Sequence, residues 1–531
     1  MFPQKVHKND MRALFNYLAK AEGRKKVGFV PADATPMINN EGHLVLSIGE
    51  RVQLITDTFY KRFSAPAEIN PTINRHDPND VPLAPFRERI VDDFHPVQMV
   101  EVVEAVKSLT GNRAPGPDGI TATPLHHLPA LYPYLQALYN AIYLTGRIPA
   151  PMCQLNLVPL PKPGKDPRLP SNKRPISLLN TMVKVMEAIM YHRILPIVEP
   201  QLTPFQFAYR RSRGTEDHLT SLVDKAHRSL LNGSFVYIIS FDIEAAFGRV
   251  PHWQITRALK RMHIDGYTRR LIHNWLKGRT FTLKQRTPQG IFYGPKKSIT
   301  CGLPQGGVLS PCLWNMVFND VPQRLQELRD AQRVPRTAFL DLVYADDFTT
   351  LITSSDLHLL KKFFTQNIHN LERVIGLKHL ILSMPKTHNI LLEPHLVPRG
   401  TYRRGPPHTT MATKTRLRLQ RTHEARFDIS ILEYNPLGPP GFEALSQAAG
   451  PTRGFPYPLS DTVRILGILL DSHQALDDHF ASLLKRSQLR QGLLAQVARK
   501  TWGLNTTVWV FWVLTGFVVP DPYRCRQITN R

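Results

Sequence analysis

Apolar side chains recur at helical spacing in several stretches of this chain and form short, continuous runs in others. Residues 96–111 show the helical pattern, with a proline at the start and a glycine at the end. Residues 235–243, FVYIISFDI, are instead continuously apolar and rich in β-branched side chains, as a strand buried on both faces would be. Helical spacing predicts further helices over 49–63, 181–195, 215–231, 252–277 and 475–519.

Residues 342–352, LVYADDFTTLI, place two acidic residues between two apolar runs, which predicts a strand, a tight turn and a second strand. Residues 302–321 begin as a Gly-rich loop and continue as an apolar helix. Further short strands are predicted over 157–160, 279–285 and 463–472. No internal repeat is visible, so we predict an α+β fold whose sheet core is assembled from strands distant in sequence.

The charge of the chain narrows the choice of partners. There are 67 Lys and Arg residues against 42 Asp and Glu, so the formal net charge is +25. The basic residues are spread along the chain and are not confined to a tail. A broad positive field favours a polyanionic partner, most commonly nucleic acid, although ribosomal, chromatin and membrane-surface proteins share this charge.

The cysteines and the apolar stretches bear on the cellular compartment. The four cysteines lie far apart without a CxxC pair, so we expect no disulfide framework, no zinc site and a reducing compartment. The N-terminus lacks the apolar core of a signal peptide, and the most apolar stretch, 508–519, is too short to span a bilayer. We therefore expect an intracellular protein, nuclear or cytoplasmic, without a membrane partner.

Three carboxylates are the candidate chemistry. Asp242 ends the apolar strand 235–243, and Asp346 and Asp347 occupy the turn of the hairpin 342–352. A lone Asp pair is more often a solvated turn, but if the two strands are neighbours, all three carboxylates converge at one edge. Such a cluster is tolerable with divalent cations, and oxygen ligands suit Mg²⁺. Two ions about 4 Å apart are the apparatus for in-line phosphoryl transfer.

Five motifs carry a resemblance to a known family. They are RAPGPDGI at 113–120, RPISLLN at 174–180, FDIEAAF at 241–247, GLPQGGVLSP at 302–311 and YADD at 344–347. In this order they make the chain, from about residue 90 to about 510, resemble the reverse transcriptase of non-LTR (LINE-type) retrotransposons. The resemblance implies a right-hand polymerase with fingers, palm and thumb, in which an antiparallel palm sheet is flanked by helices.

The resemblance also implies a division of the chain into parts. The last residues, 520–531, no longer resemble the family, so we expect a truncated thumb. The segment 394–458 is Pro-rich and basic, without a sustained period, and has the composition of a disordered insertion. The expected parts are an N-terminal linker region (1–90), fingers (91–234), palm (235–393), the insertion (394–458), the palm end with the primer grip (459–474) and a partial helical thumb (475–531).

Metal-binding roles follow from the same resemblance. Asp242 and Asp346 would be the main ligands, Asp347 would assist, and the main-chain carbonyl of Ile243 would complete a site. The implied cofactor is a pair of Mg²⁺ ions, for which Mn²⁺ can substitute.

Nucleotide and primer contacts are implied as well. Arg174 matches the residue that grips the triphosphate, and its fork of donors suits phosphate oxygens. Either Lys162 or Lys165 would add a charge, and the sequence does not choose between them. The remaining matches are Phe247 as the steric gate, otherwise a core aromatic, Gln305 and Gly306 at the nucleotide and template, Lys386 near the leaving pyrophosphate, and Leu466 and Gly467 at the primer grip.

The implied function is RNA-directed DNA polymerisation, in which a DNA primer is extended with dNTPs on an RNA template. Nothing in the sequence indicates a protein partner. Two departures, Gly248 where Asp is usual and Ala208 where Gly is usual, bear on efficiency more than on mechanism. A group II intron reverse transcriptase, a viral RNA polymerase and an inactive nucleic-acid-binding remnant stay open as alternatives.

Overall fold

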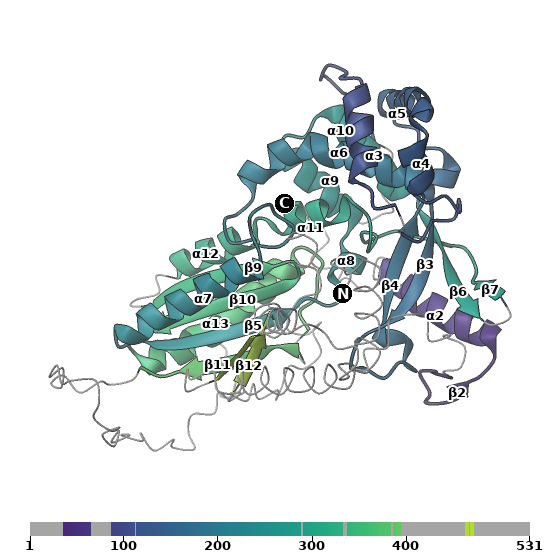
Figure 1. The fold of residues 1–531 in the computed structure, drawn as a ribbon. Coiled ribbons are helices and arrows are strands. Elements are labelled where there is room, and N and C mark those ends of the chain that lie inside the picture. The colour runs from purple at the N-terminus through teal and green to yellow at the C-terminus, as the bar shows by residue number, and fades with distance from the viewer. Residues whose placement is uncertain are drawn as a thin grey trace, which may run out of the picture. The chain divides into compact units, whose positions relative to one another are not determined.

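The computed structural model of the 531-residue chain describes residues 36–64, 86–111, 113–287, 290–332, 337–383, 386–394, 462–466 and 468–471 (Figure 1). The chain divides into two compact units. The larger is Thr35–Ser460, and it holds every described element except one hairpin. That hairpin, β12 (Thr462–Ile465) and β13 (Ile468–Asp471), belongs to the other unit, Met1–Ala34 with Asp461–Arg531.

A four-stranded antiparallel sheet is the centre of the larger unit. Its strand order is β11 (His388–Leu392), β5 (Phe235–Asp242), β10 (Asp347–Ser354) and β9 (Thr337–Tyr344). The two central strands are buried along almost their whole length. The predicted strand at 235–243 and the predicted hairpin at 342–352 are therefore confirmed, and they are neighbours.

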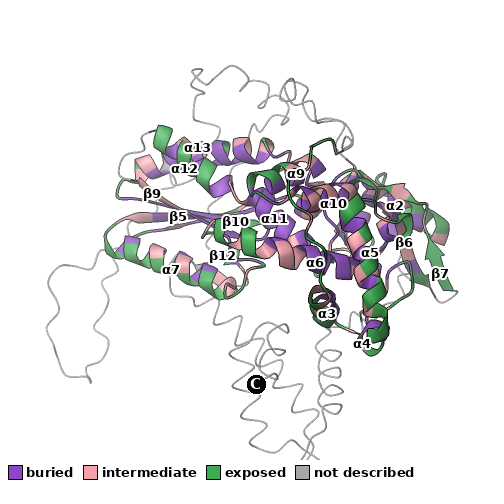
Figure 2. Cartoon of the chain, turned by 90° about the horizontal axis from the view of Figure 1, so that it is seen from above, coloured by how far each residue is buried: buried purple, intermediate pink, exposed green. Residues whose placement is uncertain are grey.

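Helices cover both faces of this sheet, which explains why its central strands are continuously apolar. Helix α7 (Thr215–Leu231) packs against β5, β9 and β10, whereas α13 (Leu357–Gly376) packs against β5 and β10 and against α12 (Val321–Ala331). Figure 2 shows α7 on one side of the strands and α12 with α13 on the other.

A second sheet runs in the order β4 (Lys173–Leu179), β3 (Gln154–Pro161), β6 (Thr280–Thr287) and β7 (Gly290–Tyr293), and β8 (Lys297–Ser298) also pairs with β6. Only the β3–β6 pairing is parallel. Helix α2 (Ile48–Phe63) packs against β6, and a short hairpin, β1 (Met37–Ile38) with β2 (Leu44–Val45), precedes it.

The other helices pack mainly against one another. Helix α6 packs against α3 and α11, α11 packs against α9, and α9 packs against α10. Their bounds are α3 (Met99–Ser108), α4 (Thr123–His127), α5 (Tyr132–Thr145), α6 (Thr181–Val198), α8 (Ala246–Arg249), α9 (His252–Arg261), α10 (Gly266–Lys277) and α11 (Ser310–Phe318), with 3-10 turns at Pro129–Leu131, Ala150–Cys153, Pro170–Asn172 and Glu199–Gln201.

Most helical predictions hold, with one correction. The stretch predicted as helical over 252–277 is two helices, α9 and α10, because His263 adopts a left-handed conformation with φ 57°. Asp265 then caps α10, its carboxylate accepting a hydrogen bond from the Thr268 amide at 2.8 Å.

Some predictions fall on parts of the chain outside the described residues. These are the linker up to residue 35, the insertion beyond Pro394 and the helical segment 475–519. Within the described residues, none of the helices is long and apolar enough to cross a membrane.

Candidate active site

The pairing of β5 with β10 brings the predicted carboxylates together. Asp347 stands directly opposite Asp242 across the two strands, and opposite Tyr344 across the β9–β10 hairpin. The hairpin closes through Ala345 and Asp346 alone, and Ala345 adopts a left-handed conformation with φ 59°. The register therefore sets all three Asp residues at one end of the four-stranded sheet.

The electrostatics of these carboxylates are unfavourable within the protein. Desolvation raises the pKa of Asp346, and the Asp242 charge raises it further. The side chain of Asp347 is more exposed, yet desolvation followed by the charges of Asp346 and Asp242 raises its pKa to about 6. Desolvation, then Asp346, likewise raises the pKa of the neighbouring Tyr209 to about 12. Like charges held at one edge favour binding of an external cation.

One protein cation reaches this cluster directly. The ammonium group of Lys386 contacts Oδ2 of Asp242 as a hydrogen-bonded ion pair. The backbone next to Asp242 is fixed as well, since its carbonyl accepts the Ser383 amide at 2.8 Å and the Glu244 amide donates to the Ile381 carbonyl at 2.8 Å. That pairing does not use the carbonyl of Ile243.

An aromatic wall adjoins the carboxylates. Phe247 on α8 is partly buried and stacks on Trp314 of α11, with ring centroids 5.4 Å apart. Tyr209 meets Phe247 edge-on at 6.2 Å. The Phe247 carbonyl accepts a hydrogen bond from the Leu303 amide at 2.6 Å, which joins the wall to the Gly-rich loop.

The Gly-rich loop 302–309 lies against β4 and α6. The Gln305 carbonyl accepts the Ser177 amide at 2.8 Å, and a Cβ on Gly306 would lie 3.0 Å from the Ser177 carbonyl oxygen. Gly306 also has φ 115°, which favours glycine. The fully buried Glu187 of α6 accepts the Val308 and Leu309 amides at 2.6 and 3.3 Å.

Basic side chains from several elements gather beside the carboxylates. Burial lowers the pKa of Lys162, and the positive charges of Arg62, Lys386 and Arg174 lower it further, whereas Asp242 raises it. These groups therefore lie within electrostatic reach of one another. Arg174 is exposed on β4, and its charge offsets part of the rise in the pKa of Asp346. Lys165 lies exposed in the same loop as Lys162.

The comparison with known protein families decides the kind of site. Residues 160–468, more than half of the chain, match the family described as reverse transcriptase (RNA-dependent DNA polymerase). The chain belongs to the reverse transcriptase family.

Curated relatives confirm the resemblance to non-LTR retrotransposons. The chain is 29% identical over 264 residues to the probable RNA-directed DNA polymerase from transposon BS of Drosophila melanogaster, and 30% identical over 275 residues to that from the mobile element jockey of Drosophila funebris. These matches cover 49% and 51% of this chain, but only 28% and 29% of the relatives. A putative 115 kDa protein of the R1DM element of Drosophila melanogaster is 28% identical over 415 residues, 77% of this chain and 34% of that protein.

The carboxylates of this reverse transcriptase domain fit divalent cations in their chemistry. Asp242, Asp346 and Asp347 offer hard oxygen ligands. Desolvation and neighbouring negative charge raise the pKa values of Asp346 and Asp347. Within the described residues, however, no three Asp, Glu, His or Cys side chains are arranged as a group that could hold a metal ion. Lys386 already lies on one Asp242 oxygen. The two-ion site stays a prediction.

The predicted primer grip is described only in part. Leu466 occupies the turn between β12 and β13 with φ 46°, and Gly467 lies outside the described residues.

Sequence reasoning missed several residues of this candidate site. Arg62 lies in a segment expected to be a linker, yet its guanidinium donates to the carbonyls of Lys173 and Ser171 at 2.9 and 2.8 Å. Tyr209 and Trp314 form the aromatic wall with Phe247. No local pattern distinguishes these side chains from surface or core residues, because their partners are distant in sequence.

Proposed function

We propose that this chain is an RNA-directed DNA polymerase that extends a primer 3′-hydroxyl with dNTPs on an RNA template. The pairing of Asp347 with Asp242, with Asp346 in the adjoining turn, is the observation that carries the proposal. In this proposal the four-stranded sheet is the palm, and β3 and β4 belong to the fingers. Strand β6, which pairs with β3, and its neighbour β7 come from the segment 235–393 that is assigned to the palm.

The carboxylates would hold the cofactor. Asp242 and Asp346 are the main ligands, Asp347 assists, and the main-chain carbonyl of Ile243 completes a site. When bound, two Mg²⁺ ions activate the primer hydroxyl and stabilise the leaving pyrophosphate. The raised pKa values of Asp346 and Asp347 support this assignment, because desolvation and the neighbouring carboxylates disfavour their charged forms in the absence of a bound cation.

The incoming nucleotide would lie between the carboxylates and the basic side chains. Arg174 binds the triphosphate. Lys162 is favoured over Lys165 as the second cation, because the charges of both Arg174 and Asp242 affect the pKa of Lys162. Phe247 closes the space beside the ribose 2′ position, and the main chain at Gln305 and Gly306 borders the nucleotide. Lys386 would have to leave Asp242 before it could act near the pyrophosphate.

Primer extension tests the proposal. The full chain is given poly(rA)/oligo(dT), dTTP and Mg²⁺, and filter binding to the same duplex is measured beside it. We expect Mg²⁺-dependent extension that EDTA abolishes. Binding without extension would indicate a nucleic-acid-binding remnant, and a preference for UTP over dTTP would indicate an RNA polymerase.

A further inference from the structure

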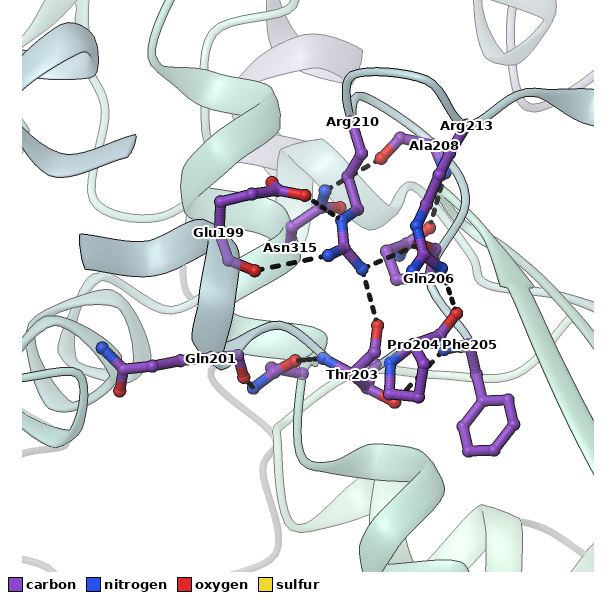
Figure 3. A network of polar contacts seen from close by, with 11 residues as sticks. Glu199, Gln201, Thr203, Pro204, Phe205, Gln206, Ala208, Arg210, Arg213 and Asn315 are labelled. Carbon is purple, nitrogen blue, oxygen red and sulfur yellow. Dashed lines mark hydrogen bonds and ion pairs between the residues drawn. The ribbon is translucent and has the colours of Figure 1, made fainter. Parts of the chain in front are cut away.

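The backbone amides and carbonyls of two buried alanines, Ala208 and Ala345, form hydrogen bonds with three side chains. These belong to Gln206 and to the consecutive α11 residues Trp314 and Asn315. Oε1 of Gln206 accepts the amides of Ala208 and Ala345 at 3.0 and 3.2 Å. The indole of Trp314 donates to the Ala345 carbonyl at 2.8 Å, and the amide of Asn315 donates to the Ala208 carbonyl at 2.9 Å. Figure 3 shows Gln206 and the Asn315–Ala208 contact within the surrounding loop. We call these five residues the alanine clamp.

Each clamped alanine adjoins a residue of the proposed site. Ala345 itself has φ 59° and is followed by Asp346, and Ala208 is followed by Tyr209, which has φ 60°. A non-Gly residue in the left-handed region costs on the order of 1–2 kcal/mol, so it persists only where surrounding contacts impose it. The alanine clamp supplies such contacts both at Ala345 and at Ala208, the residue before Tyr209.

Gln206 is itself held in place. The Phe207 amide donates to the Val343 carbonyl and the Val343 amide donates to the Phe205 carbonyl, each at 2.9 Å, so the loop adds to the free side of β9. Arg210 ties the loop to Glu199 at 2.7 Å and to the Thr203 carbonyl at 2.7 Å (Figure 3). With Gln206 only 2% exposed, water cannot replace its acceptor oxygen.

We propose that Gln206 is a positioning residue that sets two parts of the active site at once. Through Ala345 it fixes the direction in which Asp346 points, and through Ala208 it fixes Tyr209 against Phe247. This inference rests on the proposed function, since it assigns Gln206 to the cation-binding turn of the polymerase. Loss of its acceptor oxygen should therefore weaken cation binding without weakening nucleic-acid binding.

The test uses Gln206→Leu, which keeps the volume of the side chain and removes the acceptor. Mn²⁺ binding to the full chain is measured by electron paramagnetic resonance, with dTTP and a dideoxy-terminated primer on poly(rA), so that no chemistry occurs. Residues that orient metal ligands typically change metal affinity or activity roughly 10–100-fold. We expect an affinity loss of that size, a similar fall in kcat on an extendable primer, and Kd for primer–template within about twofold.

The matched control is Asn319→Ala. The side chain of Asn319 anchors the same loop, accepting the Thr203 amide at 2.6 Å and donating to the Gln201 carbonyl at 2.9 Å, and neither hydrogen bond involves a clamp residue. It should leave Mn²⁺ affinity unchanged. If Gln206→Leu does not fold, Trp314→Phe decides, because it removes the donor to Ala345 and keeps an aromatic ring beside Phe247.

Wild-type Mn²⁺ affinity in a folded Gln206→Leu variant, or in Trp314→Phe if the first is unfolded, would overturn the inference. An equal loss in Asn319→Ala would also overturn it, since the effect would then belong to the loop as a whole. A wild-type chain that binds Mn²⁺ through Asp346 but extends no primer would refute the proposed polymerase, and the Mn²⁺ comparison would still decide the role of Gln206.

Discussion

One β-hairpin of this protein carries two kinds of acidic site. Near the middle of β9, the buried Asp341 accepts hydrogen bonds from both terminal nitrogens of Arg329, at 2.6 and 2.9 Å, and from the Thr350 hydroxyl at 2.8 Å. At the turn of the same hairpin, burial and like charges raise the pKa values of Asp346 and Asp347.

The difference separates a structural acid from a functional one. Asp341 has its charge matched by a bidentate guanidinium inside the protein, so it needs nothing from outside. Among the described residues, Asp346 and Asp347 have no such bidentate partner, and in the proposed function a bound cation would stabilise their charges. Only five positions along the chain separate the charge-matched carboxylate of Asp341 from Asp346, the first of the two acids proposed to bind cations.

The largest expected effect comes from Asp346→Asn, which should abolish nucleotide addition. Loss of a group that positions charge in the transition state costs roughly 10²–10³-fold or more in kcat. Binding to primer–template should stay near the wild-type value, because the distributed positive surface is untouched. Single-turnover extension and filter binding measure the two effects, and a wild-type extension rate would refute the role of Asp346.

Arg329→Met tests the structural acid of the comparison, because it removes the partner of Asp341. Removal of one partner of a buried ion pair leaves an uncompensated charge, which costs about 3–5 kcal/mol of unfolding free energy. Urea denaturation followed by circular dichroism measures the loss. The double variant Arg329→Met/Asp341→Leu should recover much of it, since no buried charge remains. A loss below about 1 kcal/mol would mean that this pair does not behave as a typical buried one.

Sequence reasoning reached the functional acids more easily than the structural ones. The sequence predicts that Asp242 and Asp347 meet if their strands are neighbours, because each residue ends or begins an apolar run, and the strand register places the two opposite each other. Arg329 had no such signal, since an arginine in an amphipathic helix reads as solvated until the tertiary fold brings it to Asp341. Gln206 was hidden in the same way, because its partner Ala345 is 139 residues away.

The fold, like the site, was predictable only where burial leaves a pattern in the local sequence. The spacing of apolar residues predicted α7 and both central strands. A helix buried on one face and a strand buried on two each have a characteristic local pattern of apolar residues. The same periodicity predicted α9 and α10 as one helix. The break at His263 depends on a left-handed backbone conformation, which the presence of a histidine does not predict. The pairing of β3 with β6, far apart in the chain, had no local trace at all.

A smaller effect is expected from Arg174→Ala, which tests the cations that face the functional acids. Loss of charged hydrogen bonds to a triphosphate removes on the order of 1.5–3 kcal/mol, so KM for dTTP should rise roughly 10–100-fold. Kd for primer–template should change far less. Lys165→Ala, which removes an exposed charge from the neighbouring loop, is the matched control. Equal losses in KM and Kd would assign Arg174 to the template instead.

The smallest effect concerns the buried Glu187. Its charge is matched less fully than that of Asp341 and more fully than those of Asp346 and Asp347. It accepts two backbone amides but has no bidentate partner, and burial raises its pKa to about 7 despite those amides and the charges of Arg279 and Lys184. Because this pKa exceeds the ordinary value of 4.5, the folded state holds the proton more tightly between about pH 4.5 and 7. The stability that Glu187 contributes is therefore complete below pH 4.5 and is lost as the pH rises through 7. Glu187→Gln, which is neutral throughout, should flatten the urea-derived stability profile between pH 5 and 8 by on the order of 1–2 kcal/mol. An unchanged profile would mean that the loop amides satisfy Glu187 as fully as Arg329 satisfies Asp341.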